Sequence, residues 1–152
     1  MSEMQTRKRA DTALLYARPS PAVRSGVELK RCIPVITIMG IIFYFSSQPG
    51  ENIELPDIPN IDKYLHCLIY GVLALSACYS IPTLYLKTNP LRTCLQVVFF
   101  CLLYGISDEV HQSFVPMRTP SLLDLAADTF GAALAMMGVF TVNRWSAKNE
   151  ST

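Results

Sequence analysis

Three carboxyl-bearing residues stand where a membrane helix should still be apolar. Asp108 and Glu109 end the apolar run 95–107, and Asp128 opens the apolar run 129–140. A charged side chain in hydrocarbon costs at least about 2.5 kcal/mol, even on the insertion scales that give the lowest values. Acids at this depth therefore predict a site, unless the helices extend into a polar vestibule.

Other polar residues recur at helical spacing around these acids. Asp62, His66 and Tyr70 follow one another at intervals of four residues, so they share one face of a helix. The short loop that precedes the last expected helix brings Arg118 back over the acids. The full set of candidate site residues is Asp62, Lys63, His66, Tyr70, Asp108, Glu109, Gln112, Arg118, Asp124 and Asp128.

Such a cluster suits three kinds of chemistry. A histidine with several carboxylates could hold a divalent cation. His66, oriented by Asp62, could act as a general acid or base, while Arg118 or Lys63 binds an anion. A carboxylate kept neutral by burial could pass protons. The spacing does not select among the three.

Each candidate also has a purely structural interpretation. Asp62 and His66 could form an interfacial helix start, and Lys63 could be a boundary residue whose ammonium reaches the membrane surface. Arg118 could neutralise the nearby acids and lock the last two helices together. A structural polar network would produce the same pattern as a working site.

The elements that must position these residues are membrane helices. The chain is 51% hydrophobic, which is too apolar for a soluble domain of 152 residues. A span needs about 20 helical residues. The stretches free of Asp, Glu, Lys and Arg are 32–47, 64–86, 93–107 and 129–143. The sequence thus predicts an all-α, four-helix integral membrane bundle.

Local signals refine this prediction. Asn60 can cap the second helix, and Ser121 with Asp124 fits a capping box at the start of the fourth. Small residues that let membrane helices approach closely include Gly71, Gly105, Gly131 and Gly138. The five cysteines lie in or beside the spans without a Cys-x-x-Cys pair, so we expect reduced packing residues.

Basic residues predict the orientation. Of the 13 Lys and Arg residues, all but Lys63 and Arg118 lie on the side of the two termini. The positive-inside rule therefore predicts cytoplasmic termini and a multi-pass protein of the cytoplasmic (inner) membrane, with the polar cluster facing the periplasm. We divide the chain into a flexible basic leader (1–31), a membrane domain (32–143) and a short cytoplasmic tail (144–152).

Several of these residues form motifs in a familiar order. They read Phe45-Ser46-Ser47-Gln48, then Asp62-Lys63-Tyr-Leu-His66, then Tyr104-Gly105-Ile-Ser-Asp108-Glu109-Val-His-Gln112, then Arg118, and finally Asp124 through Asp128 to Gly131. Over about residues 33–142 the chain resembles the VanZ-like family of small bacterial membrane proteins. It departs from that pattern at Met117, where we expect glycine, and at Asp128, where we expect asparagine.

The resemblance implies a four-helix membrane protein and, for the founding member, a contribution to glycopeptide resistance, chiefly to teicoplanin. We expect a non-enzymatic envelope protein that binds a lipid, antibiotic or cell-wall intermediate, because no recognised catalytic motif is present. The alternative is a membrane-embedded, metal-assisted hydrolase or transferase acting on a lipid-linked phosphate, with His66 and Glu109 as base or ligands. The expected partners are the lipid bilayer and a lipid-linked or lipidated ligand, not nucleic acid. The sequence does not decide whether a metal or another cofactor binds.

Overall fold

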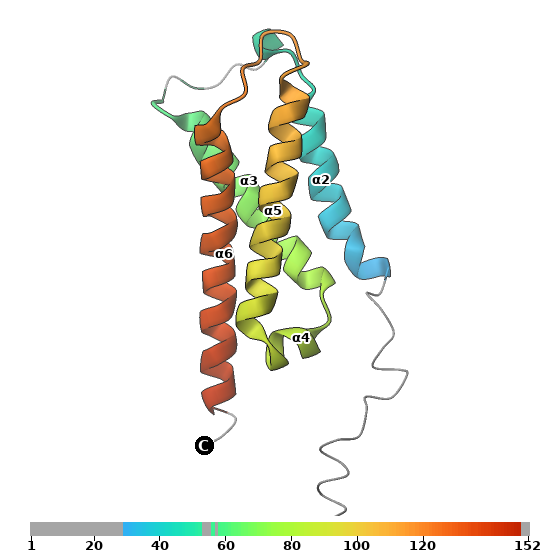
Figure 1. The fold of residues 1–152 in the computed structure, drawn as a ribbon, viewed down its shortest axis with the longest axis vertical. Helices are drawn as coiled ribbons and strands as arrows, with labels where there is room; N and C mark the ends of the chain where they lie inside the picture. Colours follow the sequence, from blue (N-terminus) through green and yellow to red (C-terminus); the bar gives the residue numbers. More distant parts are fainter. Residues whose placement is uncertain (1–28, 53–55, 57, 150–152) are drawn as a thin grey trace, which may run out of the picture.

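The computed structural model of the protein describes residues 29–52, 56 and 58–149 (Figure 1). This part of the chain is helical and contains no strand. Its elements are η1 (Leu29–Cys32), α2 (Ile33–Ser46), η2 (Gly50–Asn52), α3 (Ile61–Ser80), α4 (Thr83–Thr88), α5 (Pro90–Gln112) and α6 (Leu122–Asn149). Most of the predicted leader lies outside the described residues, and α6 continues through most of the predicted tail.

Four helices in the described part of the chain are long and apolar enough to cross a membrane. They are the continuous segment 29–46, α3, α5 and α6. This confirms the predicted all-α bundle with four spans. The third and fourth helices are longer than their charge-free runs, because α5 includes Asp108 and Glu109, and α6 begins before Asp124.

The helix starts follow from local chemistry, with one exception. Pro90 is the first residue of α5. It lacks an N–H, but the first N–H groups of a helix have no partner within the helix, so no hydrogen bond is lost. The Ser121 hydroxyl accepts a 3.3 Å hydrogen bond from the N–H of Asp124, as predicted for the start of α6. Asn60 occupies the N-cap position of α3 with a φ of 58°, but its side chain makes no capping bond. The predicted Asn60 side-chain cap is therefore wrong.

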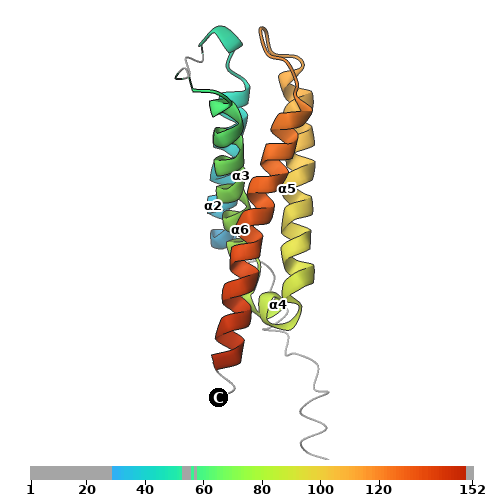
Figure 2. The ribbon, with the colours of Figure 1, turned by 90° about the vertical axis from the view of Figure 1, so that its left-hand side faces the viewer.

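Successive long helices run in opposite directions along the bundle. The start of α2, the short helix α4 and the end of α6 lie at one end, and the connections after α2 and before α6 lie at the other (Figure 1). We call the second end the loop end. Helix α6 packs along both α3 and α5 (Figure 2), whereas α2 lies at the edge of the bundle (Figure 1).

The tightest helix contact joins α3 to α6 through glycine. A Cβ on Gly131 would lie 2.0 Å from the carbonyl oxygen of Cys67, so the two backbones touch there. Gly71 lies against the same stretch, with its Cβ position 3.5 Å from the Gly131 carbonyl oxygen. The predicted close approach is confirmed at these positions. It is wrong for Gly138, which has open space around it.

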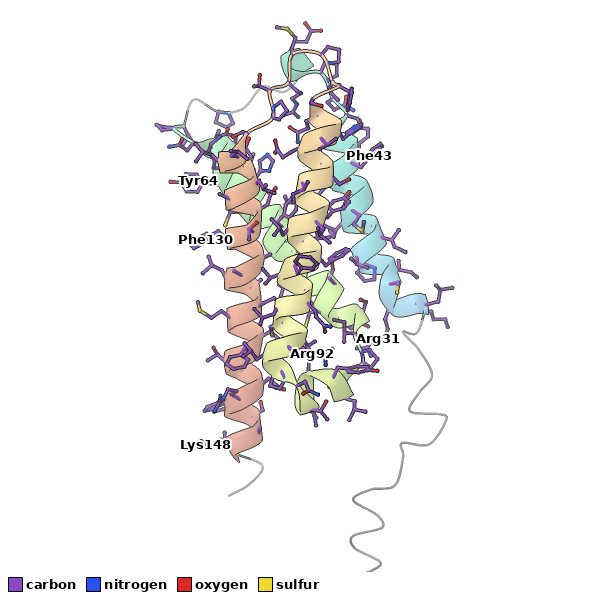
Figure 3. The ribbon with its side chains drawn as sticks, in the orientation of Figure 1. Arg31, Phe43, Tyr64, Arg92, Phe130 and Lys148 are labelled. Carbon is purple, nitrogen blue, oxygen red and sulfur yellow. The ribbon has the colours of Figure 1, made fainter. Side chains whose placement is uncertain are left out.

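Apolar side chains also cover the outside of the bundle. Tyr64 and Phe130 are exposed and point away from the helix core (Figure 3), and Phe43 is exposed as well. An apolar exterior is what a protein surrounded by lipid requires, because hydrocarbon cannot solvate polar groups. All five cysteines are free thiols, as predicted.

Candidate functional site

One ion pair and one hydrogen bond connect α3 to α6 near the loop end. The Lys63 ammonium lies 2.8 Å from Asp124 Oδ1 and 2.5 Å from Asp62 Oδ2. One turn deeper, His66 Nδ1 lies 2.9 Å from Asp128 Oδ1. The expected pairing of His66 with Asp62 is therefore wrong, because Asp62 forms an ion pair with Lys63 and His66 contacts Asp128 of α6. Lys63 thus holds two carboxylates.

Glu109 connects α5 to the first residue before α6. Its Oε2 accepts a 2.6 Å hydrogen bond from the N–H of Ser121. In a capping box, the acid three residues into the helix would take that N–H. Here Glu109 takes it from the neighbouring helix, and Asp124 is left to pair with Lys63. The local start of α6 therefore depends on a residue of α5.

His66, Glu109 and Asp128 meet between the helices, and we call them the inner cluster. One donor atom from each lies within 4.8 Å of the others. Asp128 is 0% exposed and Glu109 is 8% exposed. Asp128 Oδ2, Glu109 Oε1 and the hydroxyl of Tyr70 have no hydrogen-bond partner. Burial of unpartnered polar atoms is costly, so this cluster differs from an ordinary structural network.

Gly105 provides the space for the inner cluster. A Cβ at this position would lie 3.2 Å from Asp128 Oδ2 and 3.5 Å from Tyr70 Cε1. Gly105 is one helical turn before Glu109, so Asp128 Oδ2 faces α5 on the side that carries Glu109. The carboxylate of Asp128 thus extends from His66 on α3 toward α5.

A second polar group joins α2 to α5, and we call Ser46, Asp108 and Gln112 the α2–α5 junction. Asp108 Oδ2 accepts hydrogen bonds from the Ser46 hydroxyl at 2.8 Å and from Gln112 Nε2 at 3.0 Å. Gln112 Nε2 also donates to Ser46 Oγ at 3.2 Å. Ser46 was missed as a site residue. The available signal was its place at the end of a charge-free run, in the aromatic-Ser-Ser tract.

Arg118 holds the end of α2 and not the acids. Its Nη2 donates to the carbonyl oxygen of Phe45 at 3.0 Å, and its Nε donates to that of Gln48 at 3.3 Å. Within the described chain, no carboxylate oxygen lies within 4 Å of its guanidinium. The expectation that Arg118 neutralises the acids is therefore wrong. Basic groups commonly satisfy the last carbonyls of a helix in this way.

A groove of about 610 Å³ runs between α2 and α3 toward α5. Its walls are apolar along most of their length and include Ile41, Phe45, Leu65 and Leu68. Its polar lining comes from Ser46, Asp62, His66, Tyr70, Asp108, Gln112 and Arg118. The other predicted residues, Lys63, Glu109, Asp124 and Asp128, contribute nothing to this lining. Six of the ten candidates thus line the groove, and the other four lie in the contacts among α3, α5 and α6. Two residues of the groove lining also bond members of the second set, since His66 contacts Asp128 and Asp62 pairs with Lys63.

His111 lies apart from this arrangement. Its Nε2 is 3.0 Å from Ser47 Oγ, and its ring stacks on Phe43 with centroids 4.7 Å apart. It therefore packs between α2 and α5 and is no member of the inner cluster.

The positions of the motifs agree with a comparison to known families. The family model described as VanZ/LLP1 matches residues 32–143, which contain every candidate site residue. The chain belongs to the VanZ/LLP1 family. No curated protein and no solved structure matches it. This structure therefore shows which helices of a VanZ/LLP1 protein carry the motifs, and how the motifs contact one another.

Met117 is a strained residue of this VanZ/LLP1 protein. Its φ is 60°, in the left-handed region that a side chain disfavours, and it is 79% exposed. We expect Met117→Gly to raise the unfolding free energy by about 1 kcal/mol, because glycine adopts this φ without a Cβ clash. Thermal unfolding of the purified protein in detergent measures the change. Met117→Ala keeps the Cβ, so an equal gain from alanine would show that backbone strain is not the cause.

Proposed function

We propose that this protein binds an amphiphilic ligand, a lipid or a lipidated antibiotic, in the groove between α2, α3 and α5. Through this binding it contributes to teicoplanin-type glycopeptide resistance. The observation that carries the proposal is the groove itself, which combines apolar walls with a polar end. Its volume of about 610 Å³ falls in the usual range for small-molecule sites.

The apolar part of the groove fits an acyl chain. Leu65, Leu68 and Val72 line it from α3, and Ile41 and Phe45 line it from α2. All five side chains lie in helices that are apolar enough to cross a membrane. An acyl chain that moves from the bilayer into this groove exchanges one apolar environment for another. The apolar contact therefore provides little affinity. Specificity must come from the polar end.

The polar end offers both acceptors and donors to a headgroup. Asp62 has one oxygen on Lys63 and a side chain that is 44% exposed, so it can accept further hydrogen bonds. Arg118 lies in the groove lining with its guanidinium on two backbone carbonyls. A ligand with hydrogen-bond donors as well as an anionic or carbonyl group would match both residues.

We place the loop end on the periplasmic side. The termini of the described chain lie at the opposite end, together with Arg31, Arg92 and Lys148 (Figure 3). Basic residues favour the cytoplasmic side. The polar end of the groove then lies at the outer leaflet, where the acyl chain of teicoplanin anchors that antibiotic. An unlipidated glycopeptide such as vancomycin lacks this anchor.

The test compares two tryptophan substitutions on α3. Leu65 lines the groove and is 44% exposed, whereas Leu75 is 49% exposed and is not part of the lining. A sensitive host expresses the wild type, Leu65→Trp or Leu75→Trp at matched membrane levels, and teicoplanin and vancomycin susceptibility are measured. We expect wild-type protection against teicoplanin to exceed that against vancomycin. Leu65→Trp should lose most of this protection, because the larger side chain blocks the groove. A loss of about 1.4 kcal/mol in binding free energy lowers the affinity about tenfold.

Leu75→Trp serves as the matched control and should protect like the wild type. Equal protection by the two variants would show that the groove is not the binding site. Absence of protection by the wild type would contradict the proposed contribution to resistance. A reporter fused to the C-terminus in the same strains should read as cytoplasmic, and a periplasmic reading would contradict the proposed orientation.

A further inference from the structure

The inner cluster has the donor set of a metal site. His66 from α3, Glu109 from α5 and Asp128 from α6 each bring one donor atom within 4.8 Å of the other two. One imidazole with two carboxylates is a set that divalent transition-metal ions accept, whereas magnesium favours oxygen alone. Three ligands on three different helices also define a position between those helices.

The burial of the acids indicates that something is bound between them. Asp128 is 0% exposed, yet its Oδ2 has no hydrogen-bond partner. Glu109 is 8% exposed, and its Oε1 is likewise unpartnered. A buried carboxylate oxygen without a donor loses its hydration and gains nothing in exchange. Each of these oxygens therefore needs a partner, and the two carboxylates lie close enough together for one ion to bind both.

No basic side chain supplies that partner. The Lys63 ammonium is bound to Asp62 and Asp124, and the Arg118 guanidinium is bound to backbone carbonyls. Across residues 29–52, 56 and 58–149, no Lys or Arg nitrogen lies within 4 Å of Glu109 or Asp128. His66 carries at most one positive charge against two carboxylates. The cluster is therefore short of positive charge, which is costly at low dielectric.

We propose that His66, Glu109 and Asp128 bind one divalent transition-metal ion of the zinc or manganese class. Such an ion supplies the missing charge and a partner for both free carboxylate oxygens. Three protein ligands leave at least one coordination position for water or another small ligand. The Tyr70 hydroxyl is buried without a partner, and its ring packs with Asp128 against Gly105, so it is available to bond that ligand.

Direct metal analysis of the full-length protein tests this proposal. The protein is purified in detergent through a tag without histidine, stripped with EDTA, and dialysed separately against Zn²⁺, Mn²⁺ and Mg²⁺. Metal per chain is then measured by mass spectrometry. We expect one equivalent of Zn²⁺ or Mn²⁺ in the wild type and much less Mg²⁺, because imidazole favours the transition metals. Bound metal should also raise the thermal unfolding temperature.

His66→Gln and Asp128→Asn should each weaken Zn²⁺ binding by more than about tenfold, since loss of an outer-shell partner alone can cost that much. The control is His111→Gln, which changes the other histidine of the chain and should bind metal like the wild type. Wild-type protein that stays below stoichiometric metal at saturating Zn²⁺ and Mn²⁺ would overturn the proposal, whatever the variants do. Equal binding by the His66 and His111 variants would overturn it as well.

This inference does not depend on the proposed function. Metal content is measured without lipid or antibiotic, and susceptibility is measured on groove variants that leave the three ligands intact. A protein that binds metal but gives no teicoplanin protection would support the metal site and contradict the resistance function. Protection that depends on the groove, without bound metal, would support the ligand groove and contradict the metal site.

Discussion

Gly131→Ala should lower the unfolding free energy by about 3 kcal/mol, the upper part of the usual range for overpacking a core. The added methyl would lie 2.0 Å from the carbonyl oxygen of Cys67. A backbone atom cannot rotate away as a side chain can, so α3 and α6 must move apart. The separation would pull His66 from Asp128 and Lys63 from Asp124, whose distances are 2.9 and 2.8 Å.

The matched control lies on the same helix. Gly138→Ala also adds one methyl to α6, but nothing lies within 4 Å of its Cβ position. Alanine favours a helix over glycine by about 1 kcal/mol, so Gly138→Ala should be neutral or stabilising. Thermal or denaturant unfolding of both variants in the same detergent gives the comparison. Similar stabilities for the two would contradict the close backbone contact between α3 and α6.

Asp108→Ala should loosen α2 and cost about 2 kcal/mol, as expected when buried donors lose the acceptor that they share. Asp108 accepts from both Ser46 and Gln112, and all three residues are buried. Few residues of α2 are buried, so this helix depends on polar contacts at its end. Apolar packing adds little between helices in lipid, because lipid tails solvate apolar side chains equally well.

Hydrogen exchange of α2 amides measures this effect in a chosen region. We expect faster exchange in α2 for Asp108→Ala, with α3 and α6 close to the wild type, because those two helices are joined by other residues. Asp108→Asn retains an oxygen that can accept from Ser46 and Gln112, so it should remain near the wild type. Equal exchange for the alanine and asparagine variants would show that the α2–α5 junction does not hold the helix.

The start of α6 shows how far local sequence signals extend. Ser121 and Asp124 predicted a capping box, and the Ser121 hydroxyl does bond the Asp124 N–H. The reciprocal bond is different, because Glu109 of α5 occupies the Ser121 N–H. A local motif predicts which groups need partners at a helix start. It does not predict that a neighbouring helix supplies one of them.

The sequence by itself determined the number of membrane helices, the family and the residue types of the candidate site. Hydrophobic length controls the first, since a bilayer core of about 30 Å accepts only long apolar runs free of charge. Ordered polar motifs indicated the second and third. The match to VanZ/LLP1 over residues 32–143 agrees with the predicted resemblance.

Only the tertiary structure decided the partners. Helical spacing places Asp62 and His66 on one face of α3, yet His66 bonds Asp128 and Asp62 bonds Lys63. The same limit applies to Gly131 and Gly138, of which only the first touches another backbone. Spacing within a helix establishes which residues share a face. The rotation and axial position of each helix against its neighbours come from packing of the whole bundle, and these decide which faces meet.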